Sequence, residues 1–398
     1  MEKEIYEQML NLAHLKVDKV DYTAKTIRFY CHLDIPLMLC PLCQKELDSV
    51  ISYRTHTVRD LDISGREVYL IIRVKQFYCR DCNSYFTQAL PFADANKSYT
   101  HRQSKWIFEM SRKQPLNEVA ALTNTHSKTV ERIFYSYALP QTNERYEGVK
   151  RLGIDEFSWR KGKKDYLCVL TNLDTGETVD ILRTRNKETL IAHFKAIKLK
   201  NGANFCEQVQ VMSCDFWGPF IDIAKIIFPQ ADVVGDRFHW TAYLNKVLDQ
   251  QRKTLRKAFP KEELYKNIKW LLFRKMDTLS QNEKDDLTNV FKISPLLEEL
   301  YMLKNTFCAI FDMDIPAADA LIQIDQWIQY AQSVANEYLN TFVAFFKRQA
   351  IPITNYFKHN VSNAVTEGNN NILRTIKRFT FNMTNFDHFR ARCFAFKF

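Results

Sequence analysis

The chain has 398 residues, of which 46% are hydrophobic and 26% are charged. This length and composition suffice for two or three domains with buried cores, which excludes fibrous, collagen-like and wholly disordered proteins. The 56 lysines and arginines exceed the 46 aspartates and glutamates by ten. A basic balance of this kind favours a polyanionic partner, nucleic acid in the first place.

The positive charge is concentrated in two blocks. Residues 237–280 carry 11 Lys and Arg against 4 Asp and Glu, and residues 354–398 carry 7 against 2. The intervening residues 281–353 are acidic, with 5 against 10. Each block taken alone is also compatible with a solvated helix face. No stretch approaches the roughly 18 consecutive apolar residues of a membrane span, and the acidic start Met1–Glu4 is unlike a signal peptide, so we expect a cytoplasmic protein.

Four cysteines form two C-x2-C pairs separated by 35 residues, namely Cys40, Cys43, Cys79 and Cys82. The segments 56–61 and 68–74 between the pairs are β-rich and flank a Ser64–Gly65 turn, which predicts hairpins that bring the pairs together. Four thiolates around zinc leave no open coordination position, so we predict a structural zinc site in an N-terminal domain of residues 1–95. A redox C-x-x-C motif and inert buried thiols remain the alternatives.

Two short amphipathic helices are predicted over residues 115–123 and 127–137, joined by Asn124-Thr125-His126. This order is typical of a helix-turn-helix, and we place it in a domain of residues 96–148. Ser127 is expected to cap the second helix. That helix would present four side chains to a DNA major groove, namely Ser127, Lys128, Thr129 and Arg132. The alternative is an ordinary helical pair in a connecting domain.

The next segment has the pattern of an α/β domain. Three strands are predicted first, at residues 151–157, 165–171 and 177–182. A helix (187–196), a strand (209–214), a second helix (219–227) and a final strand (231–235) follow. This is the order of a ribonuclease H-like fold. Because the first and fourth strands are neighbours in that fold, Asp155 and Asp215 would project close together. Two adjacent carboxylates repel unless a cation lies between them, and hard oxygen ligands select Mg²⁺ or Mn²⁺.

A third candidate carboxylate, Glu367, lies at the N-terminal end of a predicted helix that runs to Phe379. The apolar spacing of this helix points one face at a sheet, while Arg374, Lys377 and Arg378 point elsewhere. Taken alone, each of the three acids is more often a solvated or capping carboxylate than a metal ligand.

Three groups of motifs, taken in order, resemble the ISL-three family of insertion-sequence transposases, which are DDE enzymes with a ribonuclease H-like catalytic domain. They lie at residues 154–162, at 214–219 with 235–239, and at 366–370 with 376–378 and 385–390. The paired cysteines and the helix-turn-helix match this family too. The resemblance implies that Asp155, Asp215 and Glu367 are the metal-binding triad, with Asp236 and His239 in supporting roles.

The resemblance also implies the remaining organisation. Residues 149–240 and 355–398 would form the catalytic domain, and residues 241–354 an all-helical insertion. At the basic start of this insertion, four residues at helical spacing are expected to contact DNA phosphates: Arg252, Lys253, Arg256 and Lys257. The same contact is expected of Arg374, Lys377 and Arg378.

The implied activity is DNA cleavage and strand transfer by two Mg²⁺ (or Mn²⁺) ions held about 4 Å apart. The partner would be double-stranded DNA, both transposon ends and target, bound by a homodimer or larger assembly in the bacterial nucleoid. Two alternatives stay open: a transposase-derived DNA-binding regulator without catalysis, and a plain ribonuclease H-like nuclease. A cleavage assay on cognate ends separates all three.

Overall fold

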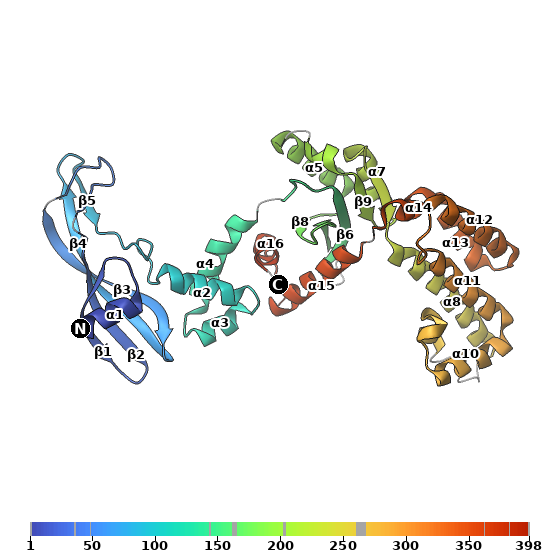
Figure 1. The fold of residues 1–398 in the computed structure, drawn as a ribbon, viewed down its shortest axis with the longest axis horizontal. Helices are drawn as coiled ribbons and strands as arrows, with labels where there is room; N and C mark the ends of the chain where they lie inside the picture. The colour runs from blue at the N-terminus through green and yellow to red at the C-terminus, as the bar shows by residue number, and fades with distance from the viewer. Residues whose placement is uncertain are drawn as a thin grey trace. The chain divides into compact units, whose positions relative to one another are not determined.

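The computed structural model describes residues 2–35, 37–47, 49–142, 145–160, 165–201, 204–259, 268–361, 363–381 and 383–396. The chain divides into two compact units, one of residues 1–142 with 387–398 and one of residues 143–386. Figure 1 shows the elements of both. Within the described ranges, no helix has the length and apolarity needed to cross a membrane.

The first unit begins with a five-stranded sheet. After helix α1 (Glu2–Leu10), the strands are β1 (Leu15–Tyr22), β2 (Thr26–Leu33), β3 (Val50–Ile63), β4 (Arg66–Cys79) and β5 (Ser84–Thr87). Their order is β1-β2-β4-β3, with β5 paired to β4. The predicted hairpin is confirmed: β3 and β4 turn at Ser64 and Gly65, which both have positive φ. Alternate residues of β4, from Val68 to Val74, are at most 2% exposed and form the core of this sheet.

Three helices follow in the same unit: α2 (His101–Ser111), α3 (Leu116–Leu122) and α4 (Ser127–Ala138), with a 3-10 turn at Leu139–Gln141. They pack around Ile107, Val119 and Val130, and the predicted helix pair is confirmed. The predicted cap is wrong. His126, not Ser127, caps α4, because its Nδ1 accepts the backbone N–H of Lys128 at 3.3 Å.

The last helix, α16 (Phe386–Ala395), packs with these helices. The Arg392 guanidinium is buried and donates to the backbone carbonyls of Ser111 and Gln114, at 3.0 and 2.9 Å. The ring of His388 stacks on that of Tyr135 at 3.8 Å. These contacts satisfy carbonyls at the C-terminal end of α2 that have no partner within the helix. Residues 387–398 therefore group with the first unit, although the sequence pattern assigned residues 355–398 to the catalytic domain.

The second unit contains the mixed sheet. Its strands are β6 (Arg151–Arg160), β7 (Asp165–Asn172), β8 (Thr178–Leu182), β9 (Val211–Cys214) and β10 (Asp232–Gly235). Their order is β10-β9-β6-β7-β8, antiparallel among β6, β7 and β8 and parallel among β6, β9 and β10. The predicted adjacency of the first and fourth strands is confirmed. This is a ribonuclease H-like arrangement.

Helices cover the two faces of this sheet differently. Helices α5 (Lys187–Asn201), α6 (Asn204–Gln208) and α7 (Gly218–Ile227) cover the face that carries Ile154 and Met212. Helix α15 (Ala364–Phe379) packs on β6 and β7, where Gly153 lies against it. Because side chains alternate along a strand, Gly153 and Asp155 share the α15 face.

The helical insertion runs from β10 to α15. It comprises α8 (Arg237–Ala258), α9 (Ile268–Phe273), a 3-10 turn (Met276–Thr278), α10 (Gln281–Ile293), α11 (Pro295–Ile310), α12 (Ala317–Ser333), α13 (Glu337–Arg348) and α14 (Ala350–His359). One core that includes Trp240, Phe307 and Phe342 holds these helices together. Helix α14 returns to the sheet edge, where the Asn355 amide donates to the Val233 carbonyl at 2.9 Å.

Candidate active site and metal centre

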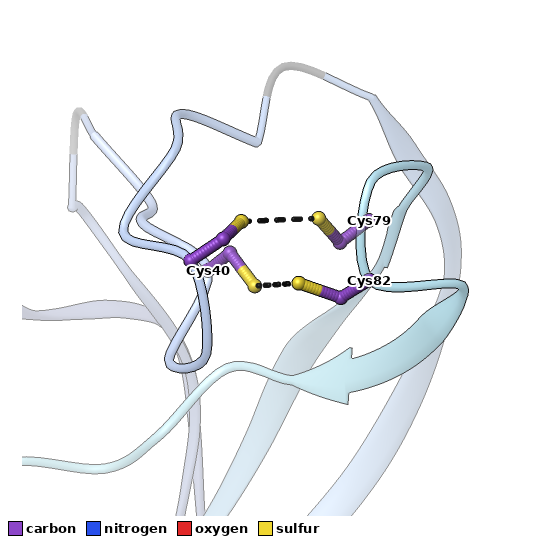
Figure 2. A group of neighbouring side chains, drawn as sticks. Cys40, Cys79 and Cys82 are labelled. Carbon is purple, nitrogen blue, oxygen red and sulfur yellow. Dashed lines mark hydrogen bonds between the residues drawn. The ribbon is translucent and has the colours of Figure 1, made fainter.

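The four cysteines converge at the end of the β4–β5 hairpin (Figure 2). Their ligand atoms all lie within 4.8 Å of one another. The Sγ atoms of Cys40 and Cys82 are 3.7 Å apart, and those of Cys43 and Cys79 are 3.6 Å apart. Tetrahedral zinc with bonds of about 2.3 Å gives sulfur separations of about 3.8 Å. The cluster therefore has the dimensions of a zinc–tetrathiolate site.

The Cys40 loop favours the thiolate that a metal requires. Burial raises the pKa of Cys40, but the backbone N–H groups of Cys43 and Leu42, together with the thiols of Cys43 and Cys79, outweigh this effect and bring its pKa down to about 7. The same sharing of protons raises the pKa of Cys79 and of Cys82. The chain is folded tightly at this knuckle, since the Gln44 N–H donates to the Cys40 carbonyl at 2.9 Å. A deprotonated sulfur in a preformed loop fits structural zinc.

Three aspartates lie near one another on the three parallel strands: Asp155 lies within β6, and Asp215 and Asp236 directly follow the ends of β9 and β10. Ile154 of β6 is in register with Cys214 of β9, and Gly235 of β10 pairs with Cys214 on the other side. The next residues along these strands are Asp155, Asp215 and Asp236. The Asp236 N–H donates to the Cys214 carbonyl at 2.9 Å, which extends the ladder by one step. The sheet thus brings together acids that are 60 and 81 residues apart.

These aspartates are crowded and poorly solvated. Burial, reinforced by the charges of Asp215 and Asp236, raises the pKa of Asp155 to about 6. Burial raises the pKa of Asp215 and of Asp236 as well, and Asp215 contributes to the rise at Asp236. The positive charge of His239 opposes each of these rises. A compact group of carboxylates with elevated pKa values is a site where a cation is favoured.

Helix α15 supplies the remaining acid. Glu367 is half-buried in its first turn, and burial followed by the charge of Asp236 raises its pKa. One turn further on, the Asn370 amide donates to Asp155 Oδ2 at 2.7 Å. The close approach of α15 depends on Gly153, because a Cβ there would lie 2.3 Å from Thr366 Oγ1.

The three predicted triad members do not form a compact ligand group in this structure. Among the described residues, only the four cysteines form a group of three or more metal-binding side chains with all ligand atoms within 4.8 Å. The three acids, Asp155, Asp215 and Glu367, are therefore more widely spaced than ligands of one ion. Asp236 and His239, for which the resemblance implies a supporting role, lie near Asp155, with Asp236 Oδ2 3.7 Å from His239 Nε2.

The candidate DNA-contacting residues differ in exposure. On α4, Ser127, Lys128 and Arg132 are exposed and Thr129 is half-buried. Arg374 and Arg378 of α15 are also exposed. Lys377 is half-buried, its Nζ donates to the Ser158 carbonyl at 3.0 Å, and burial lowers its pKa.

The position of Arg252 on helix α8 differs from the surface position that the sequence predicted. Arg256, Lys257 and Lys253 are exposed, but Arg252 is only 6% exposed and donates to Asp249 Oδ1 at 2.7 and 2.9 Å. Arg252 continues the buried stripe of Trp240, Leu244 and Leu248 at intervals of four residues. The Arg252 guanidinium is therefore part of the insertion's interior and not a surface contact for phosphate.

Two site residues were not identified from the sequence. Asn370 follows Glu367 by three residues, so helical spacing places it on the same face, and this signal was available. Arg185 follows β8 and donates to Glu156 Oε2 at 2.6 Å beside Asp155, and no motif marks it. Lys161 and Gly162, which belong to the motif at residues 154–162, lie outside the described residues.

Family comparisons cover nearly all of this architecture. A model described as transposase, of the family DDE_Tnp_ISL3, matches residues 152–393. The zinc-finger of transposase IS204/IS1001/IS1096/IS1165 matches residues 36–82, and the helix-turn-helix domain of transposase family ISL3 matches residues 88–138. The zinc ribbon and helix-turn-helix expected from the sequence are thus confirmed.

Individual relatives agree with the family models. The chain is 23% identical to the transposase for insertion sequence element IS1001 of Bordetella parapertussis over 98% of this chain and 97% of that protein. It is 24% identical over 263 residues to the transposase for insertion sequence element IS1557 of Mycobacterium tuberculosis, covering 60% of this chain and 58% of that one.

A zinc ribbon, a helix-turn-helix and a mixed sheet with clustered carboxylates define a DNA-processing protein. The match to the catalytic region spans more than half of the chain. The protein belongs to the ISL3 family of insertion-sequence transposases, and it is a DNA transposase.

Proposed function

We propose that this transposase cleaves and rejoins DNA at a two-ion site formed by Asp155, Asp215 and Glu367. The observation that carries the proposal is the register of β6 and β9, in which Ile154 pairs with Cys214, the two residues that directly precede Asp155 and Asp215. Glu367 lies on α15 close enough to Asp236 to be affected by its charge, and burial raises the pKa of all three acids.

The donor set fits magnesium. Carboxylate oxygens are the ligands that Mg²⁺ and Mn²⁺ prefer, and burial raises the pKa of each acid, so a bound cation would stabilise their ionised forms. When bound, such ions would activate an attacking water or 3′-hydroxyl and stabilise the leaving oxygen of a phosphodiester. The triad Asp155, Asp215 and Glu367 would hold the ions.

Neighbouring residues hold the acids in position. The Asp215 carboxylate accepts the Trp217 N–H at 3.1 Å, and Asp236 accepts the Phe238 N–H at 3.2 Å, which fixes both side chains at the N-terminal ends of helices α7 and α8. Asp236 thereby caps α8, and His239 lies in its first turn with its ring toward the acids. We assign Asp236 and His239 to support, and not to direct ion binding.

DNA is the substrate and partner in this proposal. Helix α4 would enter the major groove through Ser127, Lys128, Thr129 and Arg132, and the exposed Lys253, Arg256 and Lys257 of α8 would contact phosphates. Arg374, Lys377 and Arg378 would contact phosphates close to Glu367. Joining two transposon ends requires two active sites, so we propose a homodimer or a larger assembly on paired ends.

The test uses the inverted repeats that flank the gene as substrate. Asp155→Asn, Asp215→Asn and Glu367→Gln should each abolish cleavage and strand transfer in Mg²⁺ while end binding, measured by gel shift, stays within about threefold. Asp325→Asn alters an exposed acid on α12 and should retain full activity. Strand transfer by any of the three triad variants would remove that residue from the site.

A further inference from the structure

A pocket of about 520 Å³ opens beside the carboxylates of the second unit. It is lined by the start of β7, the β8–α5 connection and the N-terminal end of α7, including Tyr166, Arg183, Arg185, Lys187 and Trp217. This volume lies within the range of ordinary ligand pockets, about 300–1,000 Å³. No residue of this lining belongs to the triad.

Two bonded contacts connect the pocket to the acids. Arg185 donates to Glu156 Oε2 at 2.6 Å, and Glu156 is the residue after Asp155. Trp217 lies two residues after Asp215, and the backbone N–H of Trp217 donates to Asp215 Oδ1. A group held in the pocket would therefore lie next to the phosphodiester on which the triad acts.

Three flat side chains, those of Arg185, Tyr166 and Trp217, lie together in the pocket lining and form a platform. The Arg185 guanidinium lies 4.0 Å from the centre of the Tyr166 ring and 5.2 Å from that of Trp217. Trp217 is itself braced by Phe220, whose ring centre is 4.8 Å away. Unpaired nucleobases bind by stacking on aromatic rings and on arginine planes, and this preference tolerates any base sequence.

Two positively charged side chains at the rim of the pocket, Arg183 and Lys187, can bind phosphate. Arg183 bonds Asp165 at 2.7 and 3.1 Å, and Lys187 bonds Asp222 at 2.6 Å. All four side chains are between 20% and 47% exposed. Ion pairs at this exposure are worth little, so a DNA phosphate can compete with the carboxylates for both cations.

We propose that this pocket holds an unpaired nucleotide of the DNA strand next to the phosphodiester that the triad attacks. The base stacks on the platform of Arg185, Tyr166 and Trp217, and the adjoining phosphates pair with Arg183 and Lys187. This inference rests on the proposed function, because it takes the carboxylates to be the site of DNA chemistry. The pocket adds a way to fix the strand's position that does not depend on its sequence.

Photochemical cross-linking tests this placement. The probe is a mixed-sequence DNA duplex with a short single-stranded 3′ extension that contains one 5-iodo-2′-deoxyuridine. It is irradiated with the full-length Asp155→Asn chain, which removes any dependence on cleavage, and the cross-linked residue is identified by mass spectrometry. We expect the cross-link at Trp217 or Tyr166. Cross-links confined to other parts of the chain would overturn the proposal.

Variants then separate the pocket from general DNA affinity. In the same background, Trp217→Ala should lower the cross-link yield about tenfold, while Trp270→Ala, which removes a 67% exposed tryptophan of the insertion, should leave it unchanged. If Trp217→Ala does not fold, Arg185→Lys is the deciding variant. It keeps the positive charge but removes the planar guanidinium, so it should also lower the cross-link yield. An unchanged yield in the folded variant would refute the pocket.

The two proposals fail in different ways. Cross-linking at Trp217 together with strand transfer by a triad variant would remove that residue from the two-ion site and keep the pocket as a nucleotide site. If the triad variants lose strand transfer as predicted but no cross-link forms at Trp217 or Tyr166, only the proposal that the pocket binds a nucleotide is refuted.

Discussion

The Asn370 amide donates to Asp155 Oδ2 at 2.7 Å, which ties helix α15 to strand β6 across 215 residues of chain. Asn370 is 2% exposed and lies one turn after Glu367, so the bond connects the helix that carries Glu367 to Asp155, two members of the proposed triad. Partners that orient metal ligands typically contribute a factor of about 10–100 to metal affinity or activity.

We therefore expect Asn370→Ala to reduce cleavage by about 10–100-fold and to raise the Mg²⁺ concentration needed for half-maximal rate. Thr375→Ala, at an exposed position of the same helix, should cleave normally. Cleavage by Asn370→Ala at the normal rate and Mg²⁺ requirement would show that the bond is not needed.

The docking of α15 on the sheet depends on the absence of a side chain at residue 153. A Cβ there would lie 2.3 Å from Thr366 Oγ1 and 2.8 Å from Leu173 Cδ2. Gly153→Ala should destabilise the second unit by about 1–3 kcal/mol and displace Glu367, so cleavage should fall more than DNA binding. Gly368→Ala, where nothing lies within 4 Å, is the control for folding and should unfold at least as late as the wild type in a thermal melt. Equal melting temperatures of Gly153→Ala and the wild type would contradict this packing.

The zinc site gives a metal-content prediction. Native mass spectrometry should find one zinc ion per chain in the wild type and in Cys206→Ser, whose buried thiol lies outside the cluster. Cys40→Ser and Cys79→Ser should lose zinc and the fold of the β4–β5 hairpin, because binding and folding are coupled at such sites. Full zinc content in either variant would reject the tetrathiolate site.

The buried Lys304 makes stability depend on pH. Its Nζ donates to the Leu272 and Arg274 carbonyls, at 2.8 and 3.3 Å, and burial lowers its pKa from 10.5 to about 8. Between pH 8 and 10.5 the unfolded chain binds more protons at this site than the folded one, so the lysine's contribution to stability rises with pH across that interval.

The free energy of unfolding of the wild type, minus that of Lys304→Met, should therefore increase by on the order of 2 kcal/mol from pH 8 to pH 10. Lys292→Met, at an exposed position on α10, should show no such trend against the wild type. A difference between wild type and Lys304→Met that is flat or falls with pH would exclude a depressed pKa.

The sequence predicted the features that depend on local spacing. The Cys40 and Cys79 pairs were recognisable because zinc knuckles are set by neighbours in the chain, and Asp155 and Asp215 because acids at strand ends follow from strand order. The register of β6 and β9 confirms that adjacency. The roles of Asp155, Asp215 and Glu367 as ion ligands stay predictions.

Features that depend on tertiary packing were harder to predict from the sequence. Arg252 has the spacing of a basic surface stripe, but which side of α8 meets the bundle is decided by Trp240 and Leu248. The His126 cap was missed because a serine one residue later is the commoner capping residue. Helix α16 was assigned by its motif, whereas its burial depends on carbonyls of α2 that no local pattern shows.

The proposed mechanism requires divalent ions to bind among Asp155, Asp215 and Glu367. Iron-mediated backbone cleavage tests this directly: Fe²⁺ replaces Mg²⁺, ascorbate and peroxide generate hydroxyl radicals at the bound iron, and the cut positions are read from the protein fragments. We predict cuts next to all three residues that are lost in Asp215→Asn and suppressed by excess Mg²⁺. Cuts that are absent there, or that persist unchanged in Asp215→Asn, would contradict the two-ion site.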